Sequence, residues 1–218
     1  YAEGILDKYQ MADCKGAETP MDPGTAKALM LLPTDSPADS KVVTAFQTLV
    51  GELIWLMRTR PDLQFTICLL SRFLQCATQK HLDLARNRPL RYLRRTTYHG
   101  LLFRAGDGEW VLSGKADADL AGDATTARST LGHYLQLGEF GTIISHCKLD
   151  RRICTATGQS ETYAMQSLVK DVMWARGLLD ELGVPMNSPT VVKTDNNGVL
   201  KQSTKTINHT TAKHYRIA

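Results

Sequence analysis

A long amphipathic helix predicted over residues 160–182 constrains the fold of this chain more than any other stretch. Its apolar residues recur at every third or fourth position, which aligns them on one side of an α-helix. They are Met165, Leu168, Val172, Ala175, Leu179 and Leu182. Gly183 ends the pattern and Pro185 follows it, as expected after a helix C-terminus. A helix with one apolar face must cover another element, and its neighbours indicate a β-sheet.

Strand patterns flank this helix on both sides. Three precede it and one follows it, over residues 110–116, 131–137, 142–147 and 190–194. The first three predict an antiparallel meander. After the fourth, Asn196 is expected to cap a short helix. A long helix that crosses over to a strand parallel to the first gives an α/β fold of order βββαβα with a mixed sheet.

The first half of the chain is predicted to be mainly helical, with helical patterns over 40–57, 62–76 and from residue 78 onward. Prolines between residues 13 and 37 indicate an extended connection. Pro89 lies inside the third helix, where we expect a kink or an early end, because an internal proline costs about 3 kcal/mol.

Residues 98–104 alternate weakly between apolar and polar and are predicted to form a strand, and the turn at 106–108 is the predicted domain boundary.

A chain of 218 residues forms one large domain or two small ones. The hydrophobic fraction of 43% is ordinary for a soluble protein, and no apolar run is long enough to cross a membrane. The 5 cysteines lack metal-ligand spacing, which predicts reduced thiols in an intracellular protein. Because the chain begins with Tyr1, we expect it to be a piece of a longer one.

Glu161 lies four residues before Met165 and therefore on the buried face of the long helix, in its first turn. An acid on an apolar face is costly unless it has a partner. Attraction to the helix N-terminus explains an acid in the first turn but not its choice of face. We therefore favour a functional role.

Two further acids follow predicted strands. Asp117 follows the first strand, and Asp195 lies where the fourth strand gives way to a helix, a place where ligands gather in α/β sheets. A turn or cap role would also explain Asp195. Together with Glu161, these acids predict a site for two divalent cations. The nearby Asp119 and Asp123 are expected to be turn residues or to add negative charge outside the ligand set.

A basic stripe runs along the helix that begins near residue 78. Arg88, Arg91 and Arg95 are three and four residues apart and share one face. Such a stripe suits a nucleic-acid backbone, where each neutralised phosphate releases counterions. A solvated helix face explains it equally well.

Short motifs along almost the whole chain give it a strong resemblance to one family. The chain resembles the Pol polyprotein of copia-type LTR retrotransposons. The motifs, as they stand here, are Asp13-Cys14-Lys15, Thr19-Pro20-Met21, Val50-Gly51-Glu52-Leu53, Thr59-Arg60-Pro61-Asp62, Leu70-Ser71-Arg72-Phe73, Leu90-Arg91-Tyr92-Leu93, Asp117-Ala118-Asp119, Ala121-Gly122-Asp123, Arg128-Ser129-Thr130, Glu161-Thr162-Tyr163-Ala164, Thr194-Asp195-Asn196 and Ala212-Lys213-His214.

The resemblance implies that residues 1–108 are the thumb and connection region of a reverse transcriptase and residues 109–218 an RNase H domain. It also implies that the family's catalytic acids correspond to Asp117, Glu161 and Asp195. The implied reaction is hydrolysis of the RNA strand of an RNA–DNA hybrid by two Mg²⁺ ions about 4 Å apart, with Mn²⁺ as an alternative. The implied partners are the hybrid, which the basic helix would help to hold, and the upstream polymerase domain of the same polyprotein, in a cytoplasmic particle or the nucleus.

Several residues depart from the family pattern. Arg216 occupies the place where relatives commonly have a fourth acid, and the final helix is expected to be truncated. His214 would assist product release or serve only as a surface or packing residue. Gln159 replaces a glutamate that is not a ligand in many relatives. Leu120 and His146 stand where relatives often have tryptophan.

Three functional hypotheses therefore remain. The first is an active ribonuclease H, and the second is a catalytically inactive RNase H-like module that binds nucleic acid, which the missing fourth acid favours. The third is a transposase or integrase. That class usually ends its acidic set with a glutamate on a late helix, whereas Glu161 precedes Asp195 here, so it ranks last.

Overall fold

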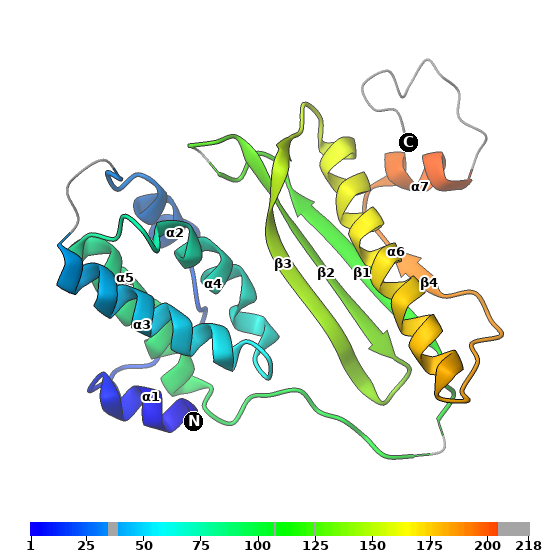
Figure 1. The fold of residues 1–218 in the computed structure, drawn as a ribbon, viewed down its shortest axis with the longest axis horizontal. Coiled ribbons are helices and arrows are strands. Elements are labelled where there is room, and N and C mark those ends of the chain that lie inside the picture. The colour runs from blue at the N-terminus through cyan, green and yellow to red at the C-terminus, as the bar shows by residue number, and fades with distance from the viewer. Residues whose placement is uncertain (35–38, 107, 124, 205–218) are drawn as a thin grey trace. The chain divides into compact units, whose positions relative to one another are not determined.

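The chain divides into two compact units, residues 1–101 and 102–218 (Figure 1). The structure, a computed structural model, describes residues 1–34, 39–106, 108–123 and 125–204. Each unit has its own hydrophobic core. The assignment of residues 1–108 to a reverse transcriptase and 109–218 to an RNase H-like domain stays a prediction.

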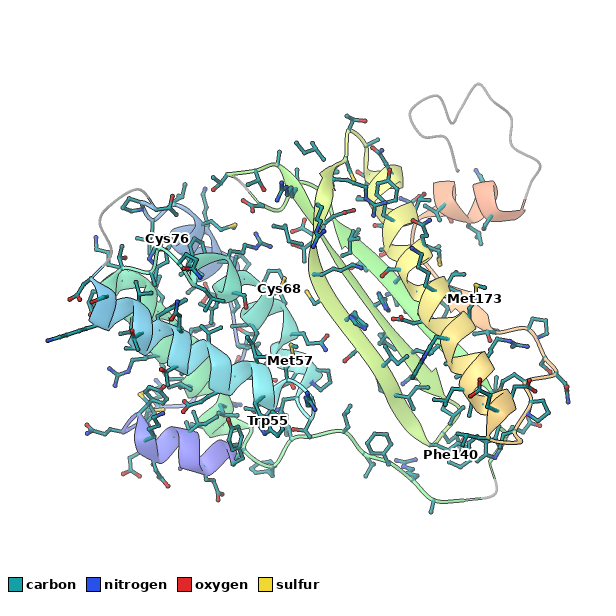
Figure 2. The ribbon with its side chains drawn as sticks, viewed as in Figure 1. Trp55, Met57, Cys68, Cys76, Phe140 and Met173 are labelled. Carbon is teal, nitrogen blue, oxygen red and sulfur yellow. The ribbon has the colours of Figure 1, made fainter. Side chains whose placement is uncertain are left out.

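The first unit is helical. Its elements are α1 (Ala2–Lys8), α2 (Pro23–Met30), α3 (Ser40–Leu56), η1 (Pro61–Leu63), α4 (Gln64–Leu70), η2 (Ser71–Phe73) and α5 (Gln79–Arg95), where η marks a turn of 3₁₀-helix. Helices α3 and α5 contact each other, and the core places Phe46 and Leu49 with Leu90 and Leu93. Trp55 lies at the end of α3 and is 58% exposed (Figure 2).

Two predictions based on proline were wrong, namely the extended connection over residues 13–37 and an early end of the third helix at Pro89. The connection predicted over residues 13–37 contains α2, because Pro23 occupies the first helical position, where its missing N–H costs nothing. The Asp22 carboxylate caps this helix by accepting a hydrogen bond from Thr25 N at 2.9 Å. Pro89 does not end α5, which continues to Arg95. Pro89 and Leu90 are both buried in this helix, and that burial offsets the lost backbone bond.

The strand predicted over residues 98–104 is also wrong, because this segment has no regular secondary structure. Tyr98, Leu102 and Phe103 are all largely exposed. In the part of the chain that the structure describes, one backbone hydrogen bond, from Arg104 N to Phe140 O at 3.1 Å, joins the end of this segment to the rest of the second unit. Without a ladder of such bonds, an alternating pattern does not produce a strand.

The second unit is a mixed sheet with a long helix across it (Figure 1). Its elements are β1 (Leu112–Asp119), β2 (Arg128–Leu137), β3 (Gly141–Ile153), α6 (Thr157–Glu181), β4 (Val191–Lys193) and α7 (Asn197–Thr204). The sheet has the strand order β3-β2-β1-β4, with β4 parallel to β1 and the other two pairs antiparallel. This confirms the α/β class and the mixed sheet.

Helix α6 packs on β1 and β2 through its apolar face. The predicted stripe is buried except at its ends, where Met165 is half-buried and Leu182, just past the helix, is 68% exposed. Gly114 in β1 lets the helix approach closely. A Cβ there would lie 2.9 Å from Leu168 Cδ1 and 2.8 Å from Tyr134 O. On the opposite side of α6, Met173 is 69% exposed (Figure 2).

None of the helices in the described ranges has the length and apolarity that a membrane crossing requires.

Candidate metal centre

Asp117 projects from β1, near the end of the strand. Its backbone is paired with Gly132 of β2, so the sheet fixes its position. The side chain is exposed, and its Oδ1 accepts a hydrogen bond from Ala118 N at 2.9 Å.

Glu161 lies near the start of α6 and is 5% exposed, on the face that carries Ala164 and Leu168. The sequence pattern placed it on this face correctly. The predicted position in the first turn is wrong, because α6 begins at Thr157, four residues before Glu161. Among the described residues, its Oε2 atom is buried with no hydrogen-bond partner. A buried carboxylate oxygen without a donor is costly in a protein interior. The position therefore calls for a ligand that neutralises it.

Asp195 follows β4 and precedes α7. The next residue, Asn196, caps α7 by accepting hydrogen bonds from Gly198 N at 2.8 Å and Val199 N at 3.2 Å. The cap role, which had been an alternative for Asp195, belongs to Asn196. Asp195 itself is exposed.

The three predicted acids meet at one point. A carboxylate oxygen from each of Asp117, Glu161 and Asp195 lies within 4.8 Å of the other two. The pKa of Glu161 is raised from 4.5 to about 7, first by burial and then by the charges of Asp117 and Asp195, whereas a hydrogen bond from the Ala118 N–H lowers it. Such a group of oxygen donors suits a hard divalent cation.

Neighbouring acids have other roles. Asp123 is buried, and its Oδ1 accepts hydrogen bonds from Thr125 N at 2.9 Å and Thr126 N at 3.2 Å, which makes it a turn residue. Asp119 is exposed at the end of β1. Gln159 Oε1 accepts a hydrogen bond from Thr155 N at 3.0 Å at the start of α6. His214 lies outside the described residues.

The arginine stripe of α5 contacts the chain's own N-terminal segment. Arg88 pairs with Asp22 at 3.1 Å, and Arg91 Nε donates to Lys15 O at 2.6 Å. Arg95 lies 3.7 Å from Glu18 in a largely exposed pair. The predicted phosphate-binding residues thus hold internal partners, and their role toward nucleic acid stays a prediction.

A second cluster joins His133 of β2, His146 of β3 and Asp171 of α6, with one donor atom from each within 4.8 Å of the others. The sequence motifs did not point to it. The signal that was present is one histidine on each of two neighbouring strands of the predicted meander, although whether the two face each other depends on the strand register.

Similarity to known proteins gives the context for this centre. No family model matches the chain, and no solved structure matches it. The chain is 30% identical over its whole length to the retrovirus-related Pol polyprotein from transposon RE1 of Arabidopsis thaliana. It is 30% identical over 98% of its length to the corresponding polyproteins from transposon TNT 1-94 of Nicotiana tabacum and transposon RE2 of Arabidopsis thaliana.

The chain spans only a small part of these relatives, 14% of the RE1 polyprotein and 16% of the TNT 1-94 polyprotein. The match to the RE1 polyprotein covers the whole chain and therefore both compact units. The chain belongs to the retrovirus-related Pol polyproteins of copia-type transposons.

Proposed function

We propose that the unit of residues 102–218 is an RNase H-like domain that hydrolyses the RNA strand of RNA–DNA hybrids, as part of a retrotransposon reverse transcriptase. The observation that carries the proposal is the convergence of Asp117, Glu161 and Asp195, with oxygens within 4.8 Å of one another. The element order β1-β2-β3-α6-β4-α7 and the Pol polyprotein relatives support it.

The residues present fit divalent cations. Three carboxylates close together repel one another, and the partnerless Oε2 of Glu161 adds to that cost. Mg²⁺ prefers carboxylate oxygens with water and phosphate oxygens in the remaining positions, and Mn²⁺ accepts the same donors. Bound there, such ions would supply activation of water and stabilisation of the leaving oxygen.

The chain's own contribution is rigid placement of three charges. Asp117 is held by the β1–β2 ladder and Glu161 by the packed face of α6, whereas Asp195 is held between β4 and the Asn196 cap of α7. Because each acid comes from a different element, the centre forms only when the unit is folded. Preorganised charge of this kind is the main contribution a protein makes to phosphoryl chemistry.

A cavity lined by basic side chains supports the proposal that this unit binds a nucleic-acid backbone. It has a volume of about 580 Å³ and is lined by parts of β2, β3 and α6, including Lys148, Arg151, Arg152 and Lys170. Arg152 is braced by Asp150 at 3.0 Å. Cations in this arrangement suit the phosphates of a duplex, whose A-form-like shape rather than base sequence would be recognised.

The polymerase part of the same polyprotein would be the upstream partner, with residues 1–101 as its thumb and connection region. The location in a cytoplasmic particle or the nucleus stays part of this proposal.

The test is cleavage of an end-labelled RNA–DNA hybrid by the purified chain with Mg²⁺. We expect cleavage of the RNA strand only, with none in double-stranded DNA. Asp117→Asn, Glu161→Gln and Asp195→Asn should each lower the rate at least a hundredfold, because each removes one charge from the centre. Asp119→Asn, an exposed acid on the same strand, is the matched control and should keep the rate within about threefold.

Two outcomes would contradict the proposal. Cleavage at the unaltered rate by the Asp117→Asn protein would show that the nuclease activity does not use this centre. Tight hybrid binding without cleavage by the unaltered chain would instead establish the catalytically inactive nucleic-acid-binding module.

A further inference from the structure

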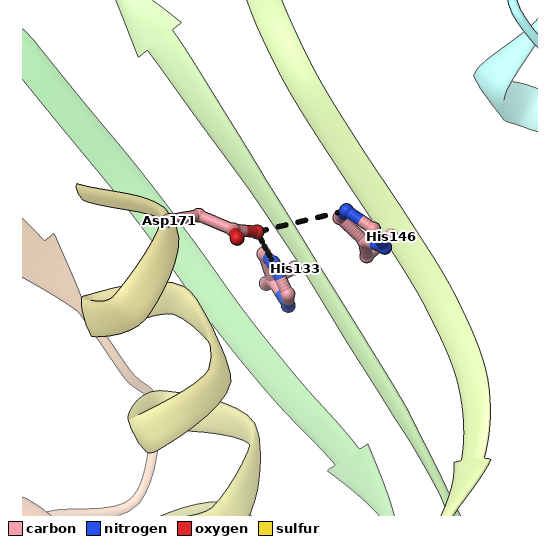
Figure 3. Close-up of side chains that lie close together, drawn as sticks. All are labelled: His133, His146 and Asp171. Atoms are coloured by element: carbon pink, nitrogen blue, oxygen red, sulfur yellow. Dashed lines mark hydrogen bonds and ion pairs between the residues drawn. The ribbon is translucent and has the colours of Figure 1, made fainter. Parts of the chain in front are cut away.

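Two imidazoles and a carboxylate converge between the sheet and α6 (Figure 3). His133 Nε2 lies 2.6 Å from Asp171 Oδ2, and His146 Nε2 lies 3.7 Å from the same oxygen. The two imidazole rings stack, with centroids 5.1 Å apart and planes inclined by 26°. Both rings thus turn the same nitrogen toward one carboxylate oxygen.

The backbone builds this convergence from three elements. His133 and His146 are directly opposed in the antiparallel β2–β3 ladder, so their side chains leave the same face of the sheet. Asp171 lies on α6, the helix that covers this face, between the buried Leu168 and Val172. Three donors on packed elements form a preorganised site.

We propose that His133, His146 and Asp171 bind one divalent transition-metal ion, with Zn²⁺ as the representative ion. Imidazole nitrogens suit zinc and its neighbours in the first transition row, whereas Mg²⁺ prefers oxygen donors alone. Three protein donors leave one position for water in a four-coordinate zinc site. This site shares no residue with the three-carboxylate centre, and the proposal does not depend on the nuclease function.

The donor distances are close to those a metal needs. Zinc bonds of about 2.0–2.2 Å to nitrogen and oxygen put the donors of a tetrahedral site about 3.4 Å apart. The observed separations from Asp171 Oδ2 are 2.6 Å to His133 and 3.7 Å to His146. Binding requires that the short contact open, that the long one close, and that the stacked rings turn so that both Nε2 atoms point at the ion. In the metal-free protein the His133 Nε2–H donates a hydrogen bond to this carboxylate. When the metal binds, that proton is exchanged through solvent for one on Nδ1, so the neutral ring presents the lone pair of Nε2.

His146 distinguishes a metal site from a simple hydrogen-bonded pair. His133 is buried and would need a partner for its ring nitrogen in any case, and Asp171 provides one. His146 is different, because its side chain is 55% exposed and its ring stacks on that of His133. Stacking holds the ring but does not determine which way its nitrogen points. The nitrogen is aimed at the same carboxylate oxygen, and that direction is the feature that a metal explains.

Lys148 lies near this site on β3, and its ammonium group donates a hydrogen bond to Ser167 Oγ at 3.1 Å. This hydrogen bond holds the Lys148 ammonium against α6, one turn before Asp171. The positive charge of Lys148 therefore repels a metal ion at the site but does not take the place of a ligand. We therefore expect a moderate affinity for zinc.

The experiment is a Zn²⁺ titration of the full 218-residue chain, first stripped with a chelator, in competition with a chromophoric zinc indicator. We expect one zinc per chain, undisturbed by excess Mg²⁺. His146→Ala should weaken zinc binding at least tenfold, and because this side chain is exposed the protein should stay folded by circular dichroism. His99→Ala, an exposed histidine of the first unit, is the matched control and should leave the affinity unchanged.

A second readout identifies the donors. Co²⁺ in place of Zn²⁺ should give the visible absorption of a four-coordinate site, and His146→Ala or Asp171→Asn should abolish that absorption. Zinc affinity that is unchanged in both of these variants would overturn the proposal. Zinc affinity that is lost in Asp117→Asn or Cys147→Ser but kept in His146→Ala would overturn it as well, because the ion would then be bound by other donors.

Discussion

The buried carboxyl of Glu161 should make the metal-free protein less stable as the pH rises. Its pKa is raised from 4.5 to about 7, first by burial and then by the charges of Asp117 and Asp195. The folded state therefore holds a proton on Glu161 that the unfolded state releases at lower pH. A carboxyl whose pKa is raised in the folded state makes the protein less stable as the pH rises from the unfolded to the folded pKa value. The lost stability is not regained at higher pH. Glu161→Gln removes the ionisation and should remove the deficit.

The size of the effect follows from that rise in pKa. A change from 4.5 to about 7, at about 1.4 kcal/mol per pH unit, gives about 3 kcal/mol as the upper value. Relaxation around the ionised group reduces it, so we expect Glu161→Gln to be more stable by about 1–3 kcal/mol at pH 8. Near pH 4.5 the two proteins should be equal. Burial lowers the pKa of His133. Its contribution to stability is the same in the unaltered protein and in Glu161→Gln, so it does not affect the stability difference between them.

Urea unfolding at pH 5 and pH 8, with EDTA present, measures this difference. A Trp55→Phe background leaves Trp110 and Trp174 of the second unit as the fluorescent reporters, so the signal follows the unit that contains the site. The two units have separate hydrophobic cores and can unfold in separate transitions. A signal from the whole chain would combine the two transitions, so the reporter has to lie in the second unit. Glu181→Gln, an exposed acid near the end of the same helix, is the control and should change stability by less than about 0.5 kcal/mol at either pH.

Mg²⁺ should reverse the order of stability. Ligand at about 100 times its dissociation constant stabilises a folded protein by about 2.7 kcal/mol. Bound Mg²⁺ should stabilise the unaltered protein by this amount at pH 8. It should stabilise the Glu161→Gln protein less, because one negatively charged ligand is missing. A stability difference that does not change with pH, or a glutamine variant that is less stable at pH 8 without metal, would refute the account of Glu161.

Four further predictions concern packing, a buried arginine and the arginine stripe. Gly114→Ala should destabilise the second unit by about 1–3 kcal/mol in urea unfolding, because the new Cβ would lie 2.8 Å from a backbone oxygen. Gly177→Ala, with nothing within 4 Å, should instead stabilise it by up to about 1 kcal/mol. Arg60→Met should cost the first unit about 3 kcal/mol, because the guanidinium is 2% exposed and bonds both Asp62 and Thr96. Arg91→Ala should leave the salt dependence of hybrid binding unchanged and speed hydrogen exchange in residues 12–22; a salt slope lower by about one would show a phosphate contact instead.

The three-carboxylate centre was largely predictable because its geometry follows from local periodicity. The 3.6-residue repeat places Glu161 on the face of α6 that its apolar residues bury, whatever lies beneath that face. Asp117 and Asp195 follow from strand ends in an α/β arrangement. The proline-based predictions failed for the opposite reason. The effects of Pro23 and Pro89 depend on whether capping or burial offsets the missing N–H, and that is decided by tertiary contacts.

The pairing of His133 with His146 could not be read from the sequence, because it depends on a change of register. Near the turn, Gln136 opposes Thr142, and this register continued without interruption would place Ser145 opposite His133. An irregularity between Leu135 and Gln136 shifts the ladder by one residue. A shift of one residue moves every later side chain of β3 to the other face. The proposed zinc site therefore exists only because of that bulge.

The arginines of α5 show a further limit of sequence patterns. Helical spacing predicts that Arg88, Arg91 and Arg95 share a face, and it says nothing about what that face meets. A backbone carbonyl, a carboxylate and a phosphate oxygen all satisfy a guanidinium. Here Lys15 O satisfies Arg91 and Asp22 pairs with Arg88, both from the N-terminal segment. Arg95, whose side chain is 57% exposed and whose nearest acid is 3.7 Å away, is the member of the stripe with the weakest internal contact. Any phosphate contact made by this helix should therefore begin at Arg95, at the helix C-terminus.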